Sequence, residues 1–70
     1  MLKDNLENWK TKGVEVSVFI NTNKLYKGKI TRFDDTSITL STLSGNVSLL
    51  IKTIVSINDG KTKITLNGSE

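Results

Sequence analysis

The residue types best suited to binding chemistry gather in one short part of the chain. Two aromatic residues lie close in sequence to three lysines: Phe19, Lys24, Tyr26, Lys27 and Lys29. Aromatic rings stack on unpaired bases while amines neutralise phosphates, so this combination suits single-stranded nucleic acid. Such stacking contributes about 1–3 kcal/mol per base. Packing in the core is the alternative for each ring, and the residues alone leave that alternative open for Phe19 and Tyr26.

The residue types behind the common catalytic mechanisms are missing. The chain has no histidine and no cysteine, which removes the commonest general base and nucleophile. Asp34 and Asp35 are adjacent in a cluster of turn-forming residues, so we expect their carboxylates to point in different directions. No motif has metal-ligand spacing, and no phosphate-binding glycine motif is present. We therefore expect a protein that is not an enzyme and that uses no cofactor or metal.

Length and charge restrict the fold and the partners. Seventy residues allow one small domain, and no stretch approaches the roughly 18 apolar residues of a membrane helix. The net charge is +3, and seven of the ten basic residues lie within residues 1–32, which favours a polyanionic partner. A domain this small without disulfides gains from oligomerisation. The absence of cysteine and of a signal peptide fits a cytoplasmic protein.

The spacing of apolar residues predicts the helix and the strands that must position these residues. Leu2, Leu6 and Trp9 share one face of a helix expected over residues 2–12, and Gly13 suits its C-terminal end. For Trp9 we expect packing rather than base stacking. Alternation of apolar residues and turn signals then predict five short antiparallel strands. The expected strands are residues 14–20, 25–34, 37–43, 47–52 and 53–57.

The fold class expected from this order is mainly β with one N-terminal α-helix. Gly28 lies inside the long second strand, where glycine marks a bulge or bend, and a bent strand can belong to both halves of a small barrel. The pattern predicts a strongly bent antiparallel barrel of the SH3-like or OB-like kind over residues 1–66. Residues 61–66 either add a short hairpin strand or fray, and residues 67–70 are expected to be a disordered tail.

Three segments resemble the Sm1 motif of the Sm/Lsm family. They are V-E-V-S-V-F at 14–19, K-G-K-I-T-R-F-D at 27–34 and I-T-L at 38–40. The preceding helix and the segment V-S-L-L-I-K-T-I-V-S-I at 47–57 are similar to the Hfq group of bacterial and archaeal RNA chaperones. The resemblance covers roughly residues 4–57. It implies a five-stranded Sm barrel assembled into a ring, a homohexamer, in which the fourth strand pairs with the fifth strand of a neighbour.

The resemblance also implies three RNA-binding surfaces. A distal face for A-rich RNA would be formed by Phe19, Thr22, Asn23, Lys24, Leu25 and Tyr26. A proximal pore for uridine-rich ends would be formed by Asp35, Thr36, Lys52 and Thr53, where the last two occupy the place of the family's lysine-histidine pair. A basic rim at the end of the helix would be formed by Lys10, Thr11 and Lys12.

Two functions from different classes are therefore expected. The first is an RNA chaperone that binds single-stranded A-rich and U-rich RNA on a ring and supports small-RNA and mRNA regulation, including stress response, in the cytoplasm and away from membranes. The alternative is an Sm-like oligomeric scaffold for protein partners, with only salt-driven affinity for nucleic acid. Preference among bases separates the two, because electrostatic attraction to phosphate is indifferent to the base.

Overall fold

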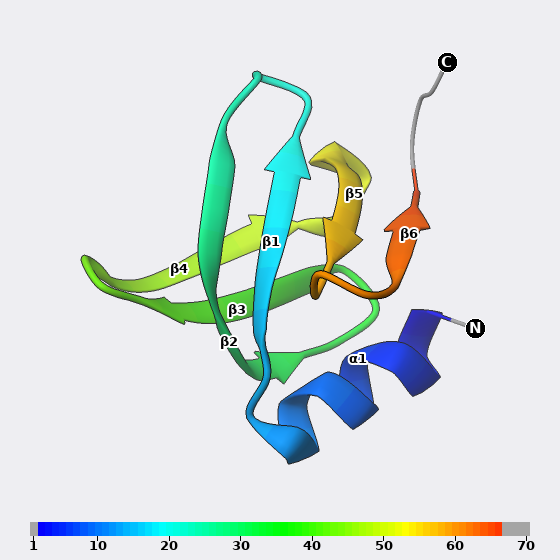
Figure 1. The fold of residues 1–70 in the computed structure, drawn as a ribbon. Helices are drawn as coiled ribbons and strands as arrows, with labels where there is room; N and C mark the ends of the chain where they lie inside the picture. The colour runs from blue at the N-terminus through cyan, green and yellow to red at the C-terminus, as the bar shows by residue number, and fades with distance from the viewer. Residues whose placement is uncertain (1, 67–70) are drawn as a thin grey trace.

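The computed structural model describes residues 2–66, so the tail expected at 67–70 lies outside the described residues. One helix precedes a strongly bent antiparallel sheet, which confirms the expected fold class (Figure 1). The elements are α1 (Leu2–Lys12), β1 (Glu15–Ile20), β2 (Leu25–Phe33), β3 (Ser37–Thr42), β4 (Gly45–Leu50), the 3-10 turn η1 (Ile51–Thr53), β5 (Ile54–Asn58) and β6 (Lys63–Thr65). Over these residues the strand order is β4-β3-β2-β1-β5-β6.

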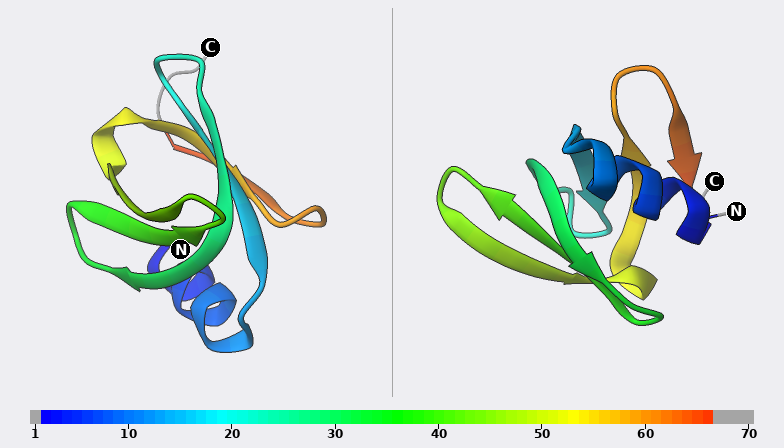
Figure 2. Two further views of the ribbon diagram at one scale, coloured as in Figure 1. Left: turned by 90° about the vertical axis from the view of Figure 1, so that its left-hand side faces the viewer. Right: turned by 90° about the horizontal axis from the view of Figure 1, so that it is seen from below.

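The helix α1 lies across one end of the bent sheet, against β2 (Figure 2). Leu6 and Trp9 are buried on its inner face, as their spacing predicts. Gly13 ends the helix with a φ of 66°, a left-handed conformation that costs glycine little. The amide of Val14 then donates to the carbonyl of Trp9 at 3.1 Å, so the chain turns directly into β1.

The core lies between the two halves of the bent sheet and the helix. Alternation along β1 directs Val16, Val18 and Ile20 inward, and all three are buried. The other buried apolar residues come from every main element: Leu6, Trp9, Ile30, Ile38, Leu40, Leu49, Ile54 and Ile57. Burial of these side chains supplies most of the driving force for folding, since the chain has no disulfide.

The bend in β2 involves two features. A Cβ atom at Gly28 would lie 2.4 Å from the backbone oxygen of Ser41, so only glycine lets β3 approach this closely. The register with β3 shifts between Ile30 and Arg32, which leaves Thr31 as the extra residue of a bulge. The glycine therefore permits close approach, and the bulge lies three residues beyond it.

The short strand β6 pairs with the edge of β5. Its partners are in register at Ser56–Thr65, Ile57–Ile64 and Asn58–Lys63, and the amide of Leu66 donates to the carbonyl of Val55 at 2.8 Å. Because β1 covers the other edge of β5, this strand has a partner on both sides. The edge that the resemblance assigns to a neighbouring subunit is therefore occupied by the same chain.

Candidate nucleic-acid interface

The outer face of β1 and β2 carries one aromatic ring and a line of cations. Phe19 lies opposite Leu25, Ser17 opposite Lys27 and Glu15 opposite Lys29. Side chains that are directly opposite in an antiparallel pair point to the same face, so these residues share the face away from the core. Phe19 is half-buried, whereas Lys27 and Lys29 are exposed.

The bulge in β2 extends this line of cations. Lys29 lies opposite Ser41 and Arg32 opposite Thr39, although three positions separate the two basic residues. Strict alternation would place them on opposite faces, and the extra residue Thr31 restores Arg32 to the face of Lys29. Lys27, Lys29 and Arg32 thus form one exposed row, which we call the β2 stripe, with Phe19 near one end.

Tyr26 lies on the opposite face from Phe19. It is paired with Val18, whose side chain points into the core, and it is half-buried against the core. Its ring lines a hollow of about 450 Å³ together with Leu43 and Val47. The two aromatic side chains therefore do not form one stacking surface within a single chain.

The other expected distal residues lie in or beside the β1–β2 turn. Thr22, Asn23 and Lys24 are exposed, and Leu25 is 58% exposed. Asn23 adopts a φ of 66°, which asparagine tolerates better than most residues. The turn closes through the amide of Ile20, which donates to the carbonyl of Lys24 at 3.0 Å. Since Phe19 precedes this turn and Leu25 follows it, the structure brings five of the six expected distal residues to one end of the hairpin.

A second candidate surface is a hollow of about 530 Å³ beside η1, which we call the η1 hollow. Its lining residues are Asp35, Thr36, Leu50, Ile51, Lys52 and Leu66. Three of the four residues expected at the proximal pore are therefore brought together. The fourth, Thr53, does not line the hollow: its hydroxyl donates to the carbonyl of Leu50 at 2.7 Å and so closes the turn.

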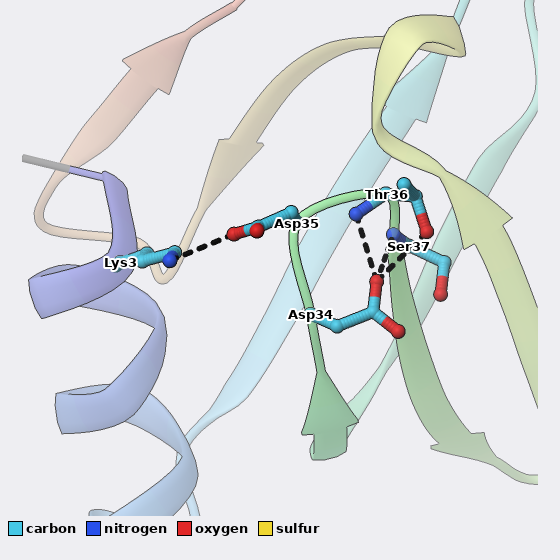
Figure 3. A network of polar contacts seen from close by, with 5 residues as sticks. All are labelled: Lys3, Asp34, Asp35, Thr36 and Ser37. Atoms are coloured by element: carbon cyan, nitrogen blue, oxygen red, sulfur yellow. Dashed lines mark hydrogen bonds and ion pairs between the residues drawn. The ribbon is translucent and has the colours of Figure 1, made fainter.

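The β2–β3 turn that forms one wall of the η1 hollow is held by Asp34 (Figure 3). One carboxylate oxygen, Oδ1, accepts hydrogen bonds from the amide of Thr36 at 2.7 Å, its hydroxyl at 2.9 Å and the amide of Ser37 at 2.9 Å. These hydrogen bonds favour the charged form and lower the pKa of Asp34 below its ordinary value. The carbonyl of Thr36 in turn accepts from the amide of Ile51 at 2.8 Å, which ties η1 to this turn.

Opposite charges meet at the η1 hollow. Lys52 is exposed, and Asp35 forms an ion pair with Lys3, with 2.7 Å between Nζ and Oδ1. This contact is drawn in Figure 3. The hydrogen bond and the negative charge of Asp35 raise the pKa of Lys3. The apolar side chains of Leu50, Ile51 and Leu66 lie beside these charges, so the hollow combines apolar contact area with a cation. That combination suits a nucleobase and its phosphate.

The expected rim residues lie in the last turn of α1 and are exposed. The hydroxyl of Thr11 donates to Oε2 of Glu7 at 3.1 Å, which places a carboxylate beside the middle residue of the rim. This local acid weakens the positive potential of the rim. The rim has two cations and the β2 stripe has three, so the rim is the smaller cationic feature.

Sequence reasoning did not place Arg32 or Leu66 on either candidate surface. A period-two count places Arg32 on the wrong face, because the bulge is not visible in the pattern. Leu66 reaches the η1 hollow only because β6 pairs with β5, a long-range contact. Residues 2–66 contain no group of three or more potential metal-ligating side chains. No helix in the described part of the chain is long and apolar enough to cross a membrane.

A short N-terminal helix followed by a strongly bent antiparallel sheet defines an Sm-like fold. A crystal structure of the pleiotropic translational regulator Hfq, at 1.55 Å resolution, resembles this chain with a TM-score of 0.78 and 24% sequence identity. The match covers 81% of this chain and 95% of that chain. No protein-family model matches the sequence, and the search of curated proteins gives no significant match. This likeness establishes that the chain has the fold of Hfq.

Proposed function

We propose that the protein binds single-stranded RNA as a non-catalytic, Hfq-like RNA chaperone. The observation that carries this proposal is the outer face of β1 and β2, where Phe19 lies on the same face as the β2 stripe. A ring at one end can stack on a base, and the row of cations can follow the phosphates. Neither contact reads a unique sequence, and a preference among bases comes from the strength of stacking on the ring, which suits a chaperone that handles many A-rich RNAs.

We assign a different kind of RNA to each of the two candidate surfaces. A-rich RNA is assigned to the end of the β1–β2 hairpin, where Phe19, Lys24 and Leu25 lie together. Uridine-rich ends are assigned to the η1 hollow, where Lys52 and Thr36 supply polar groups. Assembly into a homohexameric ring would repeat both surfaces around one axis. In this proposal the ring brings small RNAs and mRNAs together in the cytoplasm.

Fluorescence anisotropy with short labelled oligo(A), oligo(U) and oligo(C) at two salt concentrations tests the proposal. The variants are Phe19→Leu, which removes the aromatic face, and Tyr26→Leu, the matched change on the opposite face of the hairpin. Stacking predicts that Phe19→Leu weakens oligo(A) binding by about 1–3 kcal/mol, whereas Tyr26→Leu leaves it nearly unchanged. Both variants must retain the far-ultraviolet circular dichroism spectrum of the parent protein.

The scaffold alternative predicts a different outcome. Affinity would be the same for all three oligonucleotides and would fall steeply with salt in every variant, because phosphate contacts alone would carry it. That result would remove the chaperone proposal and leave the surface of the barrel as a site for proteins.

A further inference from the structure

The turn between β3 and β4 presents a leucine where turns usually carry polar residues. Thr42 pairs with Gly45, so Leu43 and Ser44 form the tip of this hairpin, which extends to one side of the molecule (Figure 1). The side chain of Leu43 is fully exposed. The hydroxyl of Thr42 donates to the carbonyl of Gly45 at 2.7 Å and accepts from the amide of Ser44 at 3.1 Å. These hydrogen bonds fix the turn, so an ordered backbone holds Leu43 in solvent, outside the core.

The exposed apolar side chains gather at one hollow. Within residues 2–66 three large apolar side chains are exposed, and two of them, Leu25 and Leu43, line the hollow of about 450 Å³ that contains the ring of Tyr26. Val47, which is half-buried, lines it as well. Single exposed apolar residues are common on protein surfaces, whereas a contiguous patch marks a site of association. We call this patch and its cavity the tip hollow.

The tip hollow carries one charge of each sign. Glu15 and Lys27 both line it, and both are exposed. Lys29 lies opposite Glu15 in the β1–β2 register, but no ion pair among residues 2–66 involves any of these three residues. An apolar surface with both charges is complementary to itself, because a two-fold axis brings the carboxylate of each copy to the amine of the other.

We propose that a second copy of this chain occupies the tip hollow in a two-fold pair. Leu43 of each copy inserts into the hollow of the other, and Glu15 of each copy faces Lys27 of the other. A second copy supplies the apolar anchor and both charges at once. The fixed turn lowers the entropy lost when the anchor is ordered on binding. This contact has the same form whether each copy is a single chain or a member of a ring.

Pairing would also restrict access to RNA. Leu25 lies at the end of the hairpin that we assign to A-rich RNA, and Lys27 belongs to the β2 stripe. A second copy in the tip hollow therefore covers part of both surfaces, so RNA and the second copy compete. This consequence rests on the proposed function, whereas the pairing itself does not.

Two charge reversals test the pairing by sedimentation velocity. Glu15→Lys alone brings two amines together and Lys27→Glu alone brings two carboxylates together, so neither variant should pair at concentrations where the parent protein does. In an equal mixture the two variants should pair with each other, because every such contact then joins a lysine to a glutamate. An attraction within one chain could not be restored by mixing. The control Lys61→Glu makes the same charge change in the β5–β6 turn and should pair like the parent.

The variant Leu43→Ser tests the apolar anchor. Because Leu43 lies outside the core, the variant should keep the circular dichroism spectrum of the parent protein. Its concentration at half-association should rise about tenfold or more, since no leucine is then buried in the pair. Equal masses of the parent and Leu43→Ser at every concentration would overturn the proposal and leave the tip hollow to a peptide or a nucleobase. A mixture of the charge variants that pairs no better than either variant alone would also overturn it.

Oligonucleotide binding, measured separately by anisotropy, distinguishes the two proposals. Pairing through the tip hollow without any base preference in RNA binding would keep the pair and remove the proposed function. Base-preferring RNA binding by a protein whose mass ignores Leu43→Ser would keep the function and remove the pair. Where both hold, oligo(A) should lower the paired fraction of the parent protein.

Discussion

The indole nitrogen of Trp9 donates a hydrogen bond of 2.9 Å to Oδ2 of Asp59, which joins two residues 50 positions apart in the chain. The other oxygen of Asp59 accepts from the amides of Thr62 and Lys61. One carboxylate therefore holds the β5–β6 turn and attaches it to α1. The hydrogen bonds from Thr62 and Lys61, and then that from Trp9, lower the pKa of Asp59. The carboxylate of Asp59 therefore couples α1 to the hairpin formed by β5 and β6.

This coupling predicts non-additive losses of stability. Trp9→Phe removes the donor while keeping an aromatic ring in the core, and Asp59→Ala removes the acceptor. Each single variant should lower the midpoint of thermal unfolding. The decrease in the double variant should be smaller than the sum of the two single decreases, because the shared hydrogen bond is lost only once. A double-mutant cycle by differential scanning calorimetry measures this. Strict additivity would show that the hydrogen bond contributes nothing to stability.

Stability should fall in acid because of Asp34 and Asp59. Both have a folded-state pKa below the ordinary value of 3.8, so the unfolded chain binds more protons in this range. Their contribution is complete well above pH 3.8 and is lost as the pH falls through that value and below it. Urea unfolding between about pH 2 and pH 7 measures the loss. In the double variant Asp34→Asn/Asp59→Asn the free energy of unfolding should depend less on pH in acid and should be lower at neutral pH. An unchanged dependence on pH in acid would contradict this explanation.

Gly28 should tolerate no larger residue. In Gly28→Ala the new Cβ would lie 2.4 Å from the backbone oxygen of Ser41, so β2 and β3 must move apart. We expect a loss of about 3 kcal/mol or more in the free energy of unfolding. Gly13→Ala is the matched control, since that site has open space but a φ of 66°, and it should cost about 1–2 kcal/mol. Denaturation in urea compares the two, and equal losses would show that the close approach of β3 is unimportant.

The β2 stripe should set the salt dependence of RNA binding. Each of Lys27→Ala, Lys29→Ala and Arg32→Ala should reduce the slope of log affinity against log salt by about 1 if the residue contacts a phosphate. Lys61→Ala, in the β5–β6 turn and away from the stripe, should leave the slope unchanged. Anisotropy titrations over a range of salt concentrations measure these slopes. A normal slope in Arg32→Ala would exclude Arg32 from the interface.

The charge of Asp35 should oppose RNA at the η1 hollow. Asp35→Asn removes a carboxylate from the wall that Lys52 shares, so the local potential becomes more positive. We expect oligo(U) affinity to rise by a few-fold at low salt, with a smaller gain at high salt. The control is Asp4→Asn, which makes the same charge change on α1 outside this hollow. An equal gain in both variants would indicate an effect of net charge and not of the hollow.

Local patterns were enough for the helix, for the five main strands and for most of the core, whereas the 3-10 turn η1 was not predicted and β6 was left open. The spacing of Leu2, Leu6 and Trp9 predicts α1, and alternation along β1 predicts its inner face, because both periods are properties of the backbone itself. Residues adjacent in the chain, such as those of the β1–β2 turn, could also be placed together. Their neighbourhood is fixed by chain connectivity and needs no knowledge of the fold.

The two aromatic residues show what cannot be predicted from the local sequence. Phe19 and Tyr26 are close in sequence, but the register of the β1–β2 hairpin places them on opposite faces. Arg32 joins the β2 stripe only through the bulge at Thr31. One inserted residue reverses the face of every later side chain in a strand. Position along the chain therefore does not determine which of these residues share a surface.

By itself the sequence determined the class of fold, the amphipathic helix, most residues of the core and the types of side chain available for binding. These follow from periodicity, composition and turn chemistry, which act over a few residues. Only the tertiary structure decided that Trp9 meets Asp59, that Lys52 and Leu66 share one hollow and that β6 covers β5. Such contacts join distant segments, and they are set by how the whole sheet bends and packs.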